Sequence, residues 1–255
     1  MKRRSNDVRN QKAELTALED RQVLNRVSTT RIVGGAAVAY AASVIVQNAM
    51  FVGGVAQLLG LGDGTAAPTY GHPLGEVLAY HAANRGAVAV AAGLEALNLP
   101  LLLLFVTGLQ GLVQRRGAAG ADWSRLAVAA GATLSALFAL VIATHIAVVL
   151  AADGLAEPTP AFELAWKLHA AAFALALPAL GATFIGAALA THASGLTRPW
   201  QRLLGVAGGS LLILAGAGNL AIADGSPLLF LGVSGLAAWL IWLVVTGLRL
   251  IRGQG

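Results

Sequence analysis

Long runs of apolar residues, separated by short polar segments, make up most of the chain from residue 32 onward. A helix that crosses the hydrocarbon core of a bilayer needs about 20 mostly apolar residues. Six runs reach that length. The sequence therefore predicts an all-α polytopic membrane bundle of six transmembrane helices, over residues 32–60, 85–113, 125–151, 163–190, 200–223 and 227–248.

The first 31 residues are polar and basic, and they precede the first apolar run. That run is longer than the roughly 7–15 residues of a signal-peptide core, so we predict a retained anchor. Leu15, Leu18 and Val23 lie among charges, which is typical either of a short interfacial helix attracted to anionic lipid headgroups or of a solvated tail. The predicted organisation is a tail over 1–31 and a six-helix transmembrane domain over 32–251.

Basic residues are unevenly distributed between the two ends of the predicted helices. With the exception of Arg85 and Lys167, every lysine and arginine falls in the tail, at the C-terminus or in the loops on the same side as both termini. Cytoplasmic loops carry such an excess. We therefore expect a multi-pass protein of the cell membrane with both its N- and C-termini in the cytoplasm.

Composition excludes several classes of protein. Only 11% of residues are charged and the mean hydropathy is +0.72, against about 25% charged residues in soluble domains. Without cysteine there is no disulfide, thiolate nucleophile or cysteine-ligated metal. The chain has no phosphate-binding loop, and no aromatic residues interleave its basic ones, so neither ATP-driven pumping by this chain alone nor nucleic-acid binding is expected.

Glu95 is the most informative polar residue. It lies about 10 residues into its predicted helix, roughly 15 Å deep at 1.5 Å per residue, where an acidic residue costs about 2.5–3.5 kcal/mol. Asn98 shares its helix face, and Gln47 and Asn48 of the first run lie at a comparable depth. These residues predict either a polar cavity with Glu95 as a protonation switch, or amides that only join neighbouring helices.

Four of the five histidines are predicted on the side away from the termini, with His72 in the first outer loop. His81 lies on the polar face of Glu95, just before the second helix and close to Arg85, whereas His145 and His169 lie at similar depths in the third and fourth helices. They are candidate ligands for a divalent metal, and His145 with His169 for a haem. No H-x-x-x-H or H-E-x-x-H spacing occurs, so no cofactor is predicted outright. Trp166 is predicted to be an interface anchor.

Residues 73–85 read PLGEVLAYHAANR and are followed by a leucine-rich helix that ends before Arg115 and Arg116. In this pattern the chain resembles small uncharacterised multi-span membrane proteins that are frequent in high-GC bacteria. The resemblance extends over most of residues 32–250. It implies the six-helix fold and no particular activity.

Three functions stay open at this point. The first, which we favour, is a proton-linked or small-solute transporter whose outward vestibule is lined by His81, Arg85, His145 and His169 and closed at depth by Glu95. The second is a membrane haem or metal redox protein that uses the outer histidines. The third is a non-catalytic accessory or scaffold subunit, since small-residue pairs such as Gly205 and Gly209 favour close helix contacts. Whether the chain forms a homo- or hetero-oligomer is not predicted.

Overall fold

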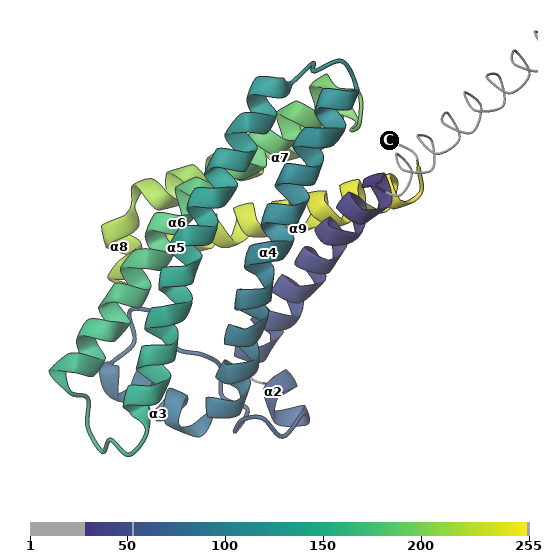
Figure 1. Cartoon of the computed structure of the whole chain (residues 1–255). Coiled ribbons are helices and arrows are strands. Elements are labelled where there is room, and N and C mark those ends of the chain that lie inside the picture. The colour runs from purple at the N-terminus through teal and green to yellow at the C-terminus, as the bar shows by residue number, and fades with distance from the viewer. Residues whose placement is uncertain (1–28, 53, 254–255) are drawn as a thin grey trace, which may run out of the picture.

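The computed structural model describes residues 29–52 and 54–253, and within them it is helical and contains no strand (Figure 1). Six of its helices are long and apolar enough to cross a membrane. The prediction of an all-α protein with six membrane-spanning helices is therefore confirmed. The expected interfacial helix of the tail lies outside the described residues.

The helices follow one another with short connections. The first span is Thr29–Phe51. It is followed by α2 (Gly54–Leu58), α3 (Leu74–Ala83), α4 (Arg85–Arg115), α5 (Ala121–Ala152), α6 (Pro160–Ala193), α7 (Pro199–Ala217), α8 (Asn219–Ala223) and α9 (Leu229–Ile251).

Two predicted runs are longer than the helices they contain. The first span ends at Phe51 rather than at residue 60. Phe51 is followed in the sequence by Val52 and two glycines, and glycine is a poor helix former. The fifth ends at Ala217 rather than at residue 223, and Gly218 separates it from α8. In both places an apolar run continues past the end of the helix, so hydropathy alone overestimated its length.

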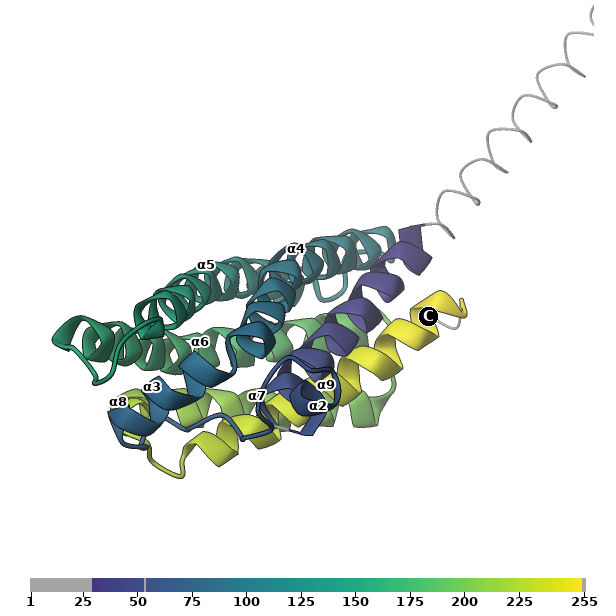
Figure 2. The same ribbon diagram turned by 90° about the horizontal axis from the view of Figure 1, so that it is seen from below.

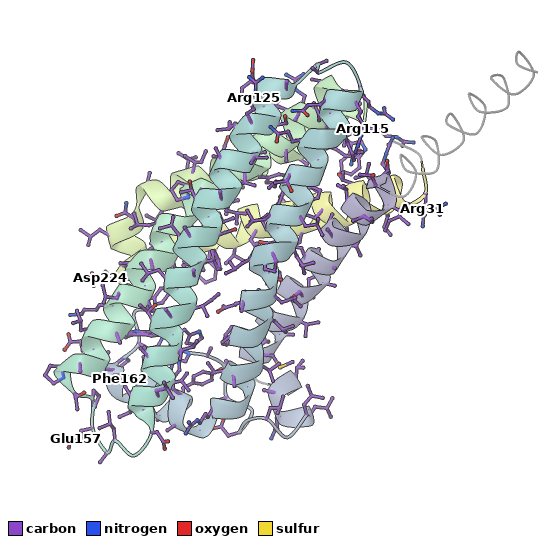
Figure 3. All side chains as sticks on the ribbon, in the orientation of Figure 1. Arg31, Arg115, Arg125, Glu157, Phe162 and Asp224 are labelled. Carbon is purple, nitrogen blue, oxygen red and sulfur yellow. The ribbon has the colours of Figure 1, made fainter. Side chains whose placement is uncertain are left out.

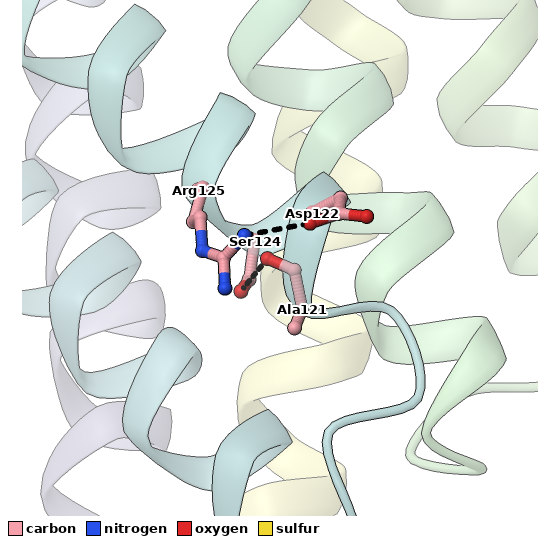
Figure 4. Close-up of polar contacts among 4 residues, drawn as sticks. All are labelled: Ala121, Asp122, Ser124 and Arg125. Carbon is pink, nitrogen blue, oxygen red and sulfur yellow. Dashed lines mark hydrogen bonds and ion pairs between the residues drawn. The ribbon is translucent and has the colours of Figure 1, made fainter.

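Charged residues mark the two ends of the bundle. Arg31, Arg115 and Arg125 lie at one end, called here the basic end, and Glu157 lies at the other, called the far end (Figure 3). At the basic end of α5, Arg125 pairs with Asp122 at 2.7 Å and the Ser124 hydroxyl donates to the Ala121 carbonyl oxygen (Figure 4). The connection that carries α2 and α3 lies across the far end, as the view from below shows (Figure 2).

Helix α6 is the most buried of the six spans and packs against both α5 and α7. Its contact with α7 depends on glycine, because a Cβ atom built on Gly181 would lie 2.5 Å from the carbonyl oxygen of Gly209, and one built on Gly209 would lie 2.7 Å from that of Gly181. Close backbone approach of this kind supplies van der Waals contact where lipid gives no hydrophobic drive for helices to associate.

The variant Gly181→Ala should therefore lower stability, although alanine is the better helix former. The added methyl group must separate two backbones, and such overpacking costs about 1–3 kcal/mol. Gly93→Ala is the matched control, because Gly93 is an exposed residue of α4 with nothing within 4 Å of its Cβ position. Unfolding in mixed micelles should show a loss for Gly181→Ala and no loss for Gly93→Ala. Equal behaviour of the two variants would contradict this account of the α6–α7 contact.

Candidate functional site

A cavity of about 380 Å³ lies inside the bundle. Its wall is formed by residues of the first span, α4, α5, α6 and α9, together with α3 and the segment that precedes it. Most of these residues are apolar or aromatic. Glu95, His81, His145 and His169 all line this one cavity, so the two polar groups singled out from the sequence share a single space.

Glu95 is held by a side chain from another helix. The Gln47 amide donates from Nε2 to Glu95 Oε1 at 2.8 Å, and Gln47 Oε1 accepts from Asn98 Nδ2 at 3.0 Å. All three side chains are buried. Gln47 thus joins two residues of α4 to the first span, and the structure brings together three of the four residues expected in the midplane cluster.

Two oxygen atoms of this cluster have no hydrogen-bond partner. Glu95 Oε2 and Asn98 Oδ1 are buried and unpaired, although buried polar atoms in proteins are nearly always hydrogen-bonded. Leaving such a group unpaired costs about 1–3 kcal/mol. Because Glu95 and Asn98 both line the cavity, their unpaired oxygens are candidate acceptors for a ligand that donates hydrogen bonds.

Asn48 and Arg85 lie differently from the sequence expectation. Asn48 lines the cavity, but its amide donates to the Val44 carbonyl oxygen of its own helix at 2.8 Å. Arg85 is paired with Asp153, and both side chains are more than half exposed. The vestibule is therefore not lined by Arg85, because this residue begins α4 at the far end, where its charge stays in contact with solvent and with the end of α5.

The three histidines converge from three helices. The ring centroids of His145 and His169 are 4.7 Å apart, and those of His81 and His145 are 5.5 Å apart. His81 Nδ1 lies 2.7 Å from the Val77 carbonyl oxygen, and His169 Nδ1 lies 3.0 Å from that of Val141. A carbonyl accepts only, so Nδ1 carries the proton in both rings and Nε2 keeps its lone pair. Burial lowers the pKa of His81 below its ordinary value of 6.5.

The geometry of these rings bears on the metal and haem hypotheses. Among residues 29–52 and 54–253, no group of three or more histidine, aspartate or glutamate side chains is placed to hold a metal ion. A haem iron bound by His145 and His169 would need a coordinate bond of about 2 Å to each ring, with the porphyrin between them. Rings with centroids 4.7 Å apart are in direct contact, so this arrangement does not fit a haem between them.

Two aromatic residues that sequence reasoning did not place in the site belong to it. Tyr70 packs on Trp166 and His169, with ring centroids 5.2 and 5.8 Å apart. Burial raises the pKa of Tyr70, and the negative charge of the nearby Glu95 carboxylate raises it further. Trp166 is buried and lines the cavity rather than acting as an interface anchor. The sequence feature that could have pointed to Tyr70 is its place as an aromatic residue among the small and polar residues of a loop.

The segment that carries Tyr70 covers the cavity at the far end. Residues 67–70 line the cavity, and the segment is fixed at several points. Ala67 N donates to the Phe51 carbonyl oxygen at 2.9 Å, and the Asn84 side chain both accepts from Asp63 N at 3.0 Å and donates to Asp63 Oδ1 at 2.9 Å. Hydrogen bonds from Thr65 and Asn84 hold the Asp63 pKa below its ordinary value. We call residues 67–70 the roof segment.

No family model, curated protein or solved structure matches this chain. Its six apolar helices are those of a multi-pass integral membrane protein. The roles of Glu95 and of the histidines stay predictions, which rest on the cavity and its unpaired polar atoms.

Proposed function

We propose that this protein is a membrane carrier that binds a small solute in its central cavity and exchanges a proton at Glu95. The observation that carries the proposal is the shared cavity, in which a buried carboxyl group with one unpaired oxygen faces the same space as three histidines. A structural carboxyl group would be expected to have both oxygens paired. Ionisable residues at such depth are rare outside binding sites and proton pathways.

The two polar groups lie at different levels of the cavity. Glu95 and Asn98 come from the middle of α4, whereas His145 and His169 come from the far-end halves of α5 and α6. His81 and His169 each keep a lone pair on Nε2, which can accept a hydrogen bond from a solute or a water molecule. The histidines therefore supply hydrogen-bond acceptors between Glu95 and the far end.

Movement of the roof segment is part of the proposal. A carrier exposes its site to one side of the membrane at a time, and residues 67–70 cover the site at the far end. In this proposal the structure corresponds to a closed conformation, and the far-end exchange of solute requires the roof segment to lift from Trp166 and His169.

We further propose that the basic end faces the cytoplasm of a cell membrane, because cytoplasmic loops are enriched in lysine and arginine. Three helix ends lie on that side and carry an arginine each: Arg31 in the first span, Arg115 in α4 and Arg252 after α9. The tail would then adjoin anionic headgroups of the inner leaflet.

Proton movement through the purified protein tests the role of Glu95. In proteoliposomes loaded with a pH-sensitive dye, with a potassium diffusion potential as the driving force, the wild-type chain should admit protons faster than protein-free liposomes. Glu95→Gln keeps the size and the bond to Gln47 but removes the exchangeable proton, so the protein-dependent rate should fall at least about tenfold, within the contribution typical of a positioned acid or base.

Glu163→Gln is the matched control, because it makes the same chemical change in a surface residue that pairs with Lys167 outside the cavity. Its proton rate should equal that of the wild type. An unchanged rate in Glu95→Gln, with the protein folded and reconstituted, would contradict the proposal.

The orientation of the protein in the membrane is tested separately by labelling single introduced cysteines, because the chain has no cysteine of its own. A membrane-impermeant maleimide added to intact cells should label Glu157→Cys, in the far-end loop between α5 and α6, and should label Arg116→Cys at the basic end only after the cells are opened. Both residues are exposed. The reverse pattern would place the far end in the cytoplasm.

A further inference from the structure

Side chains lie between the cavity and each end of the bundle. At the far end the cavity is covered by the roof segment, through the contacts of Tyr70 with Trp166 and His169. Towards the basic end, Leu102, Leu180 and Leu236 are the last cavity-lining residues of their helices. Exchange with water at either end therefore needs a rearrangement.

The seal at the basic end is an aromatic cluster one turn beyond those leucines. Phe105, Phe184, Trp239 and Trp242 are all fully buried. Trp239 and Trp242 are stacked at 5.5 Å between ring centroids, and Phe184 lies 4.9 Å from Trp239. Four large buried rings in contact with one another occupy the bundle at this level.

The side of the bundle is different. The first span and α9 touch near the basic end, where a Cβ atom on Gly34 would lie 2.6 Å from the Gly247 carbonyl oxygen. From there the two helices diverge, α9 running towards α8 while the first span descends towards α2 (Figure 1). Residues of both diverging halves, including Val44 and Val233, line the cavity. We call this gap between the two helices the lateral seam.

Val233 is a residue of the lateral seam that both lines the cavity and is exposed. Its exposed fraction is 51%, so at this point the cavity wall is also the outer surface of a membrane-spanning helix. Large apolar side chains are exposed on both helices here, including Ile45 and Val46 of the first span and Phe230 and Leu231 of α9, together with the polar residues Asn48 and Ser234.

The cavity wall indicates what kind of molecule would fit. Phe138 and Phe173, with Tyr40 and Trp166, supply flat aromatic surfaces, against which an aromatic ring packs favourably. At the α4 wall, Glu95 Oε2 and Asn98 Oδ1 are hydrogen-bond acceptors without donors. The complement of these features is an aromatic ring that carries a hydroxyl donor, with an apolar tail that can lie in the seam.

We propose that the solute is a lipid-dissolved phenol-type amphiphile, which enters through the lateral seam and donates the single proton of its hydroxyl group to Glu95 Oε2. This inference rests on the proposed carrier function, because it names the solute of the same cavity. The ring lies among the aromatic residues, and the alkyl tail leaves between the first span and α9.

Binding of 4-nonylphenol to the full chain in lipid nanodiscs tests the headgroup. Radiolabelled probe is measured on captured nanodiscs, and empty nanodiscs give the amount that partitions into lipid. The wild type should bind the phenol saturably, and the methyl ether 4-nonylanisole, which has no donor, should compete at least about tenfold less well, as expected for one lost hydrogen bond to a charged group.

Glu95→Gln sharpens this test. With its oxygen still accepting from Gln47, the glutamine places an NH2 donor where Oε2 was an acceptor. Phenol binding should weaken by about tenfold or more, and binding of the ether should not weaken. Equal binding of phenol and ether to the wild type, or an unchanged preference in Glu95→Gln, would overturn the inference about the headgroup.

The lateral route is tested by the rate of binding. Val233→Phe narrows the seam and should slow association of 4-nonylphenol several-fold, whereas Val90→Phe, at a 40% exposed valine of α4 that does not line the cavity, should leave the rate unchanged. Equal rates would overturn lateral entrance. If proton movement depends on Glu95 but no saturable phenol binding is found, this solute is rejected and the carrier function stands. If phenol binds saturably but no proton movement depends on Glu95, the carrier function is rejected.

Discussion

The hydrogen bond between Gln47 and Glu95 is the interaction on which the site depends. A carboxyl group within a membrane-spanning helix is tolerated only when partners or water satisfy it, and Gln47 supplies a donor from the neighbouring span while its own oxygen accepts from Asn98. Gln47 is thereby bonded to α4 through both its amide nitrogen and its amide oxygen. One oxygen on each of Glu95 and Asn98 is left over, and the cavity lies beside them.

The fold that surrounds this bond follows from small residues at the crossings. Gly181 and Gly209 let α6 and α7 approach backbone to backbone, and Gly34 and Gly247 do the same for the first span and α9. Helices α6 and α7 stay close farther along, where a Cβ atom on Gly216 would overlap the ring of Pro178, whereas the first span and α9 diverge (Figure 1). The buried tryptophans of α9 lie towards the basic end, and the three histidines line the cavity.

Much of this was predictable from the sequence, for reasons that are local. Apolar run length gives the six spans, and helical spacing places Glu95 and Asn98 on one face at the depth of Gln47; it also gives His145 and His169 similar depths. The positions of Arg85, Tyr70 and Trp166 in the structure were not predictable in this way, because they depend on how a loop folds back. The roof segment is positioned by contacts between residues distant in sequence, such as Ala67 with Phe51 and Tyr70 with Trp166, and periodicity carries no information about them.

The central claim is that the Gln47–Glu95–Asn98 cluster is present for a ligand and not to hold the helices together. The most direct measurement is the free energy of unfolding of the full chain in mixed micelles after all three residues are replaced by leucine. Replacing a buried polar cluster by apolar residues of similar volume is often neutral or stabilising by about 1–4 kcal/mol. The account predicts that the triple variant is at least as stable as the wild type; a clear loss of stability would contradict it and show that the cluster serves to join the first span to α4.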